Sequence, residues 1–132
     1  MSLPKLLIPE SKDAPEVVLD PVDGVFKIHG KSFPENAEKF YRPIINWLDD
    51  LGGTSTQASN GKGFDFLFYY INSSSVFALL ELLNKIKSLN DAGFSFEVIW
   101  RHDEDDDDIR RIGEDYARLT SLDIQLVAEA DE

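Results

Sequence analysis

The apolar run at residues 64–71 constrains the fold most, because its side chains are apolar at both alternating positions after Asp65. A strand of this kind is typical of the middle of a sheet that is covered on most of both faces. The polar residues 72–75 follow directly, and residues 76–89 then carry apolar side chains at helical spacing. Residues 94–100 alternate again. We therefore expect a strand–helix–strand unit, whose crossover is right-handed in almost all known cases.

A hairpin and a long helix are predicted before this unit. Residues 17–19 and 25–29 are short β-rich runs, and the segment between them contains Asp-Pro and Asp-Gly pairs that favour a turn. Ser32 and Glu35 have the spacing of a capping box, so the helix is expected to begin there. Its apolar pattern continues to Leu51, where two glycines end it.

A third helix at residues 109–119 and a last strand at residues 124–127 complete the prediction. The expected fold is a single α/β domain with a mixed, mostly parallel sheet of about four to five strands packed with three helices. Residues 1–15 are rich in proline and are expected to form an extended N-terminal arm. The α/β domain then occupies residues 16–132.

The charge and composition exclude several classes of function. A formal net charge of -12 repels nucleic acid phosphates and anionic lipid headgroups, so no nucleic acid partner is expected. The chain has no cysteine, which excludes disulfides, thiolate metal sites and cysteine nucleophiles and fits a reducing cytoplasm. Its apolar runs are far shorter than the roughly 18 residues that cross a bilayer, so membrane insertion is not expected. We therefore predict a cytoplasmic protein.

The turn Asn72-Ser73-Ser74-Ser75 is the strongest candidate for a functional site, because it joins the central strand to a helix. Sheets of α/β proteins commonly place functional groups at such junctions. Asn and Ser are also the preferred residues for capping a helix, so capping is the competing interpretation. A hydrolase nucleophile elbow would need glycines beside the serine, and residues 70–77 contain none.

The acidic run at residues 103–108 is not expected to bind a metal ion. An EF-hand loop needs a glycine at its sixth position and a glutamate at its twelfth. Counted from Asp103, the sixth residue is Asp108 and the twelfth is Glu114, so only the second requirement is met. Negative charges in the first turn of a helix stabilise its positive end, which explains the run without a ligand. The same solvated face is also available to a partner protein.

Catalysis has little support in the sequence. His29 and His102 are the only histidines, and neither has a serine or carboxylate at a spacing that indicates a catalytic triad. A small enzyme that uses Asp65, His29 or the serine turn stays open as an alternative, although no motif supports it. We expect no enzymatic activity and no cofactor.

The order and spacing of several motifs resemble the SiaC-type biofilm-regulating phosphoproteins. The resemblance runs from about Leu7 to Ala130. The segments that carry it are Phe33-Pro34-Glu35-Asn36, Ile45-Asn46-Trp47, Tyr70-Ile71-Asn72-Ser73-Ser74-Ser75, Trp100 and Gly113-Glu114-Asp115-Tyr116.

This resemblance implies a protein that a serine/threonine kinase modifies and a PP2C-type phosphatase restores. It also implies that the unphosphorylated form binds and stimulates a GGDEF diguanylate cyclase, which makes cyclic di-GMP and controls biofilm formation. The family's modified residue is the second member of an Asn-Thr-Ser-Ser turn and maps onto Ser73, with Ser74 as a competitor. The implied partner-binding residues are Asn72, Ser73, Ser74, Ser75 and Phe77, and Phe77 stands where relatives often have lysine.

The turn also resembles, over a shorter stretch, the Asp-Ser-Ser-Gly segment of anti-sigma factor antagonists with the STAS fold. That similarity implies a STAS-like arrangement of strand, phosphorylated residue and helix. It supplies the alternative function, an anti-sigma factor antagonist in a partner-switching pathway.

Overall fold

The computed structural model describes residues 3–54 and 62–130. The strands are β1 (Leu6–Ile8), β2 (Glu16–Asp20), β3 (Val25–Ser32), β4 (Gly63–Ile71), β5 (Glu97–Asp103) and β6 (Ile124–Glu129). The helices are α1 (Ala37–Leu51), α2 (Ser73–Asp91) and α3 (Asp107–Thr120).

All six strands form one sheet, in the order β1-β2-β3-β4-β5-β6. β2 pairs antiparallel with β1 and β3, and the pairs from β3 to β6 are parallel. The predicted α/β fold with three helices and a mixed, mostly parallel sheet is therefore confirmed. The sheet has one strand more than expected, because residues Leu6 to Ile8 within the expected arm pair with β2.

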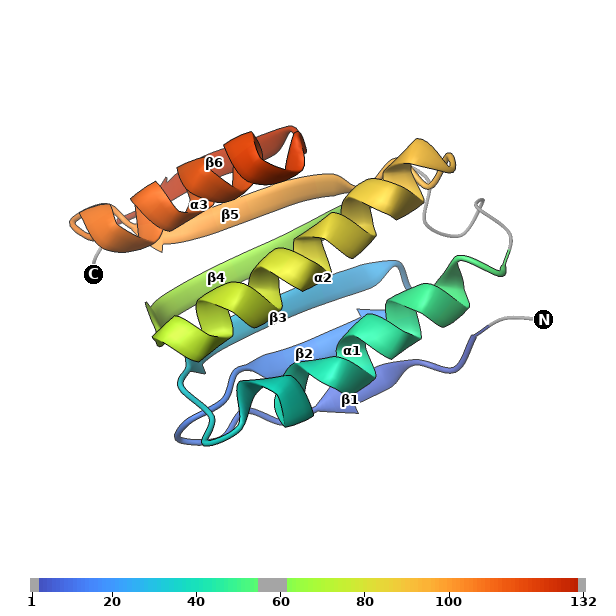
Figure 1. Cartoon of the computed structure of the whole chain (residues 1–132), viewed down its shortest axis with the longest axis horizontal. Coiled ribbons are helices and arrows are strands. Elements are labelled where there is room, and N and C mark those ends of the chain that lie inside the picture. The colour runs from blue at the N-terminus through green and yellow to red at the C-terminus, as the bar shows by residue number, and fades with distance from the viewer. Residues whose placement is uncertain (1–2, 55–61, 131–132) are drawn as a thin grey trace.

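The three helices lie on the same face of the sheet (Figure 1). Each crossover from β3 onward moves to the next strand in the same direction, and crossovers of one hand then place every helix on one side. β4 shows the result, since Phe64, Phe66 and Phe68 are fully buried whereas Leu67 is only half-buried and Tyr69 is exposed. The expectation that this strand is covered on most of both faces was wrong.

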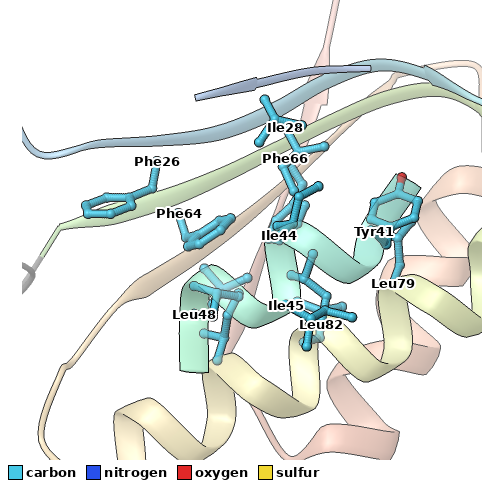
Figure 2. Close-up of a cluster of buried hydrophobic side chains, with 14 of the residues drawn as sticks. Phe26, Ile28, Tyr41, Ile44, Ile45, Leu48, Phe64, Phe66, Leu79 and Leu82 are labelled. Carbon is cyan, nitrogen blue, oxygen red and sulfur yellow. The ribbon is translucent and has the colours of Figure 1, made fainter. Parts of the chain in front are cut away.

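The core fills the space between the sheet and the helices (Figure 2). Phe26 and Phe64 stack at 5.9 Å between ring centroids, and Phe66 continues the stack at 5.0 Å from Phe64. Helix α1 covers them with Ile44 and Leu48, both fully buried. Burying each of these side chains contributes about 1.5–3 kcal/mol, so this layer holds α1 against the sheet.

The predicted start of α1 was wrong by several residues. Ser32 remains the last residue of β3, paired with Ile71 of β4. The cap is instead Asn36, whose side-chain oxygen accepts a hydrogen bond from the Lys39 backbone N–H at 3.0 Å. Pro34 explains the difference, because a proline disfavours helical backbone at the residue before it.

The acidic run begins α3, as expected from its charge. Asp106 is the cap and accepts a hydrogen bond from the Ile109 backbone N–H at 3.0 Å. Asp107 and Asp108 occupy the first turn of the helix, where the positive end of the helix dipole stabilises them.

Candidate functional site

The carboxyl ends of β3, β4 and β5 lie at one end of the molecule, and all three helices begin there (Figure 1). The turn at residues 72–75 lies at this end, where β4 stops at Ile71 and α2 starts at Ser73. Groups at the carboxyl ends of parallel strands are the ones that an α/β fold makes available to ligands and partners. The predicted strand-to-helix junction is therefore confirmed.

Asn72 holds the turn in a fixed geometry. Its side-chain oxygen accepts a hydrogen bond from the Ser75 backbone N–H at 2.9 Å, and its own backbone N–H donates to the Ser32 carbonyl at 2.9 Å. The Ser74 hydroxyl also points to the Asn72 side-chain oxygen, at a long 3.4 Å. Asn72 therefore caps α2. The three serines of the turn differ from one another in burial and in their contacts.

Ser75 is a structural residue. Its side chain is fully buried and its hydroxyl accepts a hydrogen bond from Ser32 at 2.9 Å. The Tyr41 hydroxyl lies 2.6 Å from that of Ser32, and burial raises the pKa of Tyr41 although the hydrogen bond to Ser32 opposes this. This chain of hydroxyls ties α1, β3 and α2 together beneath the turn. Ser75, which the family resemblance implies to be a partner-binding residue, supports the turn from below.

Ser73 and Ser74 are both exposed, but their surroundings differ. Ser74 lines a groove of about 390 Å³ between the first turns of α1 and α2. The same groove is lined by the carboxylates of Glu35, Glu38 and Glu81. Like charges close together are unfavourable, so a phosphate on Ser74 would meet repulsion within this groove. Ser73 is not among the residues that line it.

Helix α2 is suited to receive an anion at its first turn. α1 has Glu38 in its first turn and α3 has Asp107 and Asp108, whereas the first turn of α2 contains no acidic residue. An anion near a helix N-terminus is stabilised by typically 0.3–1 kcal/mol. A phosphate on Ser73 would therefore supply the negative charge that the other two helices carry in their own side chains.

Exposed aromatic side chains surround the turn. Phe77 is 73% exposed, just after the first turn of α2, and Tyr70 is 52% exposed just before residues 72–75. The Tyr70 ring meets Phe33 edge-to-face, with 5.8 Å between ring centroids. This pair was not predicted from the sequence, because Phe33 lies within the expected start of a helix. The Pro34 that follows Phe33 was the signal, because it keeps Phe33 out of the helix.

The other candidate residues lie on the open face of the sheet or in the core. His29 Nε2 is 2.8 Å from Asp65 Oδ1, and Arg101 Nε donates to both Asp65 oxygens at 2.9 and 3.1 Å. Arg101 Nη1 also donates to Glu129 Oε1 at 2.8 Å, so the network joins four strands. His102 is buried and contacts only a backbone carbonyl through its ring nitrogen. Neither histidine is hydrogen-bonded to a serine of residues 3–54 or 62–130, so no triad forms among these residues.

Within residues 3–54 and 62–130, no three or more His, Asp or Glu side chains are grouped to hold a metal ion. None of α1, α2 and α3, the helices of these same segments, has the length and apolar character needed to cross a bilayer.

A model of the SiaC family regulatory phosphoproteins matches residues 8–129, nearly the whole chain. The chain belongs to the SiaC family. An uncharacterized protein of Pseudomonas aeruginosa strain UCBPP-PA14 is 22% identical over 111 residues, which cover 84% of this chain and 86% of that protein.

Solved structures of SiaC share the fold of this family member. The crystal structure of apo-SiaC from Pseudomonas aeruginosa superposes with a TM-score of 0.83 at 21% identity, covering 96% of this chain and 100% of that one. SiaC in the crystal structure of diguanylate cyclase SiaD in complex with its activator SiaC, from the same organism, gives a TM-score of 0.83 at 21% identity. That match covers 94% of this chain and 99% of the other. The predicted family resemblance is thus confirmed.

Proposed function

We propose that this SiaC-family chain is a switched activator of a GGDEF diguanylate cyclase and has no catalysis of its own. Its unphosphorylated form binds and stimulates the cyclase, which raises cyclic di-GMP synthesis and controls biofilm formation. The observation that carries the proposal is an exposed serine hydroxyl, that of Ser73, at the start of α2 in a family of regulatory phosphoproteins. The relative SiaC is the activator of SiaD, which supports a diguanylate cyclase as the partner.

The proposed switch acts on binding and leaves the fold intact. Phosphorylation of Ser73 adds about -1.5 to -2 charges at the first turn of α2, where free backbone N–H groups accommodate an anion. A partner that packs over the turn must instead strip this anion of water, which costs several kcal/mol without a compensating cation. The unmodified hydroxyl carries no such penalty, so only the unphosphorylated surface is complementary to the cyclase.

A serine/threonine kinase and a PP2C-type phosphatase set the state of this turn. Ser73, Ser74 and Phe77 offer exposed side chains to these enzymes and to the cyclase, and Asn72 is half-buried beside them. Ser75 contributes by anchoring the turn through its buried hydrogen bond to Ser32.

Ser73 is expected to be the residue that the cognate kinase modifies. Its hydroxyl is exposed, whereas Ser75 is fully buried and Ser74 lines a groove with three carboxylates. Phosphopeptide mapping of wild type, Ser73→Ala and Ser74→Ala should therefore find label in the wild type and in Ser74→Ala only. Undiminished label in Ser73→Ala would show that another residue is the acceptor.

Addition of the unphosphorylated chain to a purified GGDEF diguanylate cyclase of the same organism is expected to raise cyclic di-GMP production. The increase should saturate with the concentration of the chain, because it reports formation of a complex. Production measured by chromatography, with heat-denatured chain as the control, tests this directly. An unchanged rate at saturating chain, together with tight binding to an anti-sigma factor, would favour the anti-sigma antagonist instead.

A further inference from the structure

The exposed aromatic side chains of the whole chain gather around the switch turn. Among its nine Phe, four Tyr and two Trp residues, the four that are exposed are Phe33, Tyr69, Tyr70 and Phe77. Tyr69 and Tyr70 lie just before the turn, separated from it by Ile71, Phe77 follows it after Val76, and Phe33 contacts Tyr70. We call these four residues the aromatic collar. Exposed aromatic clusters beside a polar rim are typical of protein–protein interaction sites.

An acidic groove flanks the collar on the side of α1. This groove of about 390 Å³ is lined by Phe77 together with Glu35, Glu38 and Glu81. Arg42 pairs with Glu38 and Glu81, each at 2.8 Å, so it neutralises part of this charge. Glu35 has no ion pair with any residue of the described segments.

A second acidic groove flanks the collar on the side of α3. It has a volume of about 480 Å³, and Tyr69 forms its aromatic wall. The other residues that line it are Asp103, Asp105, Asp106, Asp107 and Asp108. Arg110 pairs with Asp107 at 3.3 Å, and the Asp105 carboxylate has no ion pair within residues 3–54 and 62–130. The apolar collar therefore lies between two acidic patches.

We propose that the aromatic collar and its two acidic grooves form one docking surface for an amphipathic segment of the cyclase, with an apolar ridge bordered on both sides by arginine or lysine. The proposal rests on the function proposed above and adds the chemistry of the partner surface. The charge pattern carries it, because an apolar strip between two acidic patches is complementary to an apolar ridge between basic residues. The net charge of -12 would also steer a basic segment toward the chain.

The same surface explains how phosphorylation would release the partner. Ser73 is exposed and lies between Tyr70 and Phe77 along the chain, so a segment docked on the collar would cover it. The basic residues of the segment pair with Glu35 and Asp105 at the borders, away from the centre. When the segment binds, a phosphate on Ser73 would lose its water to apolar groups and would have no cation within hydrogen-bonding distance, which weakens binding.

Removal of the Phe77 ring tests the collar. Phe77→Ala should weaken binding of the unphosphorylated chain to the purified cyclase at least tenfold in calorimetry, because central aromatic side chains dominate such interfaces. Leu119→Ala is the matched control, since Leu119 is also an exposed apolar side chain on a helix and lies near the far end of α3. It should bind as wild type does. Both variants should keep the melting temperature of the wild type.

Charge reversal tests the two grooves. Glu35→Lys and Asp105→Lys should each weaken binding about three- to tenfold at about 50 mM salt, and the loss should nearly vanish at about 500 mM salt. Asp50→Lys makes the same change in net charge at the opposite end of α1 and should leave the affinity nearly unchanged.

The outcomes separate the docking surface from the proposed function. One outcome would overturn the docking surface alone. In it, the wild type binds the cyclase and is released by phosphorylation, but Phe77→Ala binds the cyclase as tightly as the wild type does. If Glu35→Lys and Asp105→Lys weaken binding no more than Asp50→Lys does, the segment of the cyclase has no basic residues at its borders. A wild-type chain that binds no cyclase would overturn the proposed function and the docking surface together.

Discussion

Gly113→Ala is expected to lower the free energy of unfolding by roughly 1–3 kcal/mol, although alanine is the better helix former by about 1 kcal/mol. Gly113 lies within α3, where the helix passes close to the buried ring of Trp100. A methyl group there would clash with Trp100 Cδ1 and would lie 2.8 Å from Leu126 Cδ2. Trp100 has little freedom to move, because its indole N–H donates to the Ile109 carbonyl at 2.9 Å.

Gly53→Ala is the matched control for this substitution. A methyl group at Gly53 would have only the Asp50 carbonyl as a close neighbour, at an ordinary 3.5 Å. The free energy of unfolding of Gly53→Ala, measured by urea denaturation, should therefore lie within about 0.5 kcal/mol of wild type, as for most surface substitutions. If Gly113→Ala were as stable as Gly53→Ala, then α3 would not pack against Trp100 in the way described.

Ser73→Asp is expected to weaken binding to the cyclase at least tenfold, or about 1.4 kcal/mol, with almost no change in thermal stability. The stability should hold because the first turn of α2 has no acidic residue of its own, and an added anion there gains from the helix dipole. The affinity should fall because the partner must desolvate that anion between exposed aromatic rings. Aspartate carries less charge than phosphate, so its effect should be the smaller of the two.

Ser73→Ala is the control for this prediction, because it removes the hydroxyl without adding charge. It should bind nearly as tightly as wild type, since the Ser73 hydroxyl makes no hydrogen bond with residues 3–54 or 62–130 that the substitution would break. A melting temperature far below wild type in Ser73→Asp would instead identify the hydroxyl as a buried part of the fold, contrary to its exposure.

The strand–helix–strand unit was predictable from the sequence because its signals are local. Val98 and Trp100 alternate with partly exposed residues in β5, and this alternation predicted both the strand and its buried face. The continuous apolar run of β4 predicted a strand, but it did not show that only the face of Phe64 and Phe66 is buried. The position of the serine turn between β4 and α2 followed from the same pattern.

The parts that failed depend on contacts between distant segments. Ser32 has the local spacing of a helix cap, but its pairing with Ile71 and its hydrogen bond to Ser75 keep it in the sheet. β1 is only three residues long and exists through its pairing with β2, for example Leu7 with Val18. Neither interaction leaves a periodic trace in the sequence.

The candidate site was predictable in position but not in detail. Sequence similarity singled out the serine turn, yet only burial distinguishes the exposed Ser73 from the buried Ser75. The aromatic neighbours Phe33 and Tyr70 are far apart in the chain, and the parallel pairing of β3 with β4 brings them together. The roles of these residues in phosphorylation and partner binding stay predictions.

The most direct test of the switch is a calorimetric titration of the purified cyclase with two forms of one preparation, the chain phosphorylated by its kinase and the same chain after phosphatase treatment. The account predicts that the treated form binds and that the phosphorylated form binds at least tenfold more weakly, while both melt at the same temperature. Equal affinity of the two forms would contradict it, because the Ser73 turn would then lie outside the interface with the cyclase.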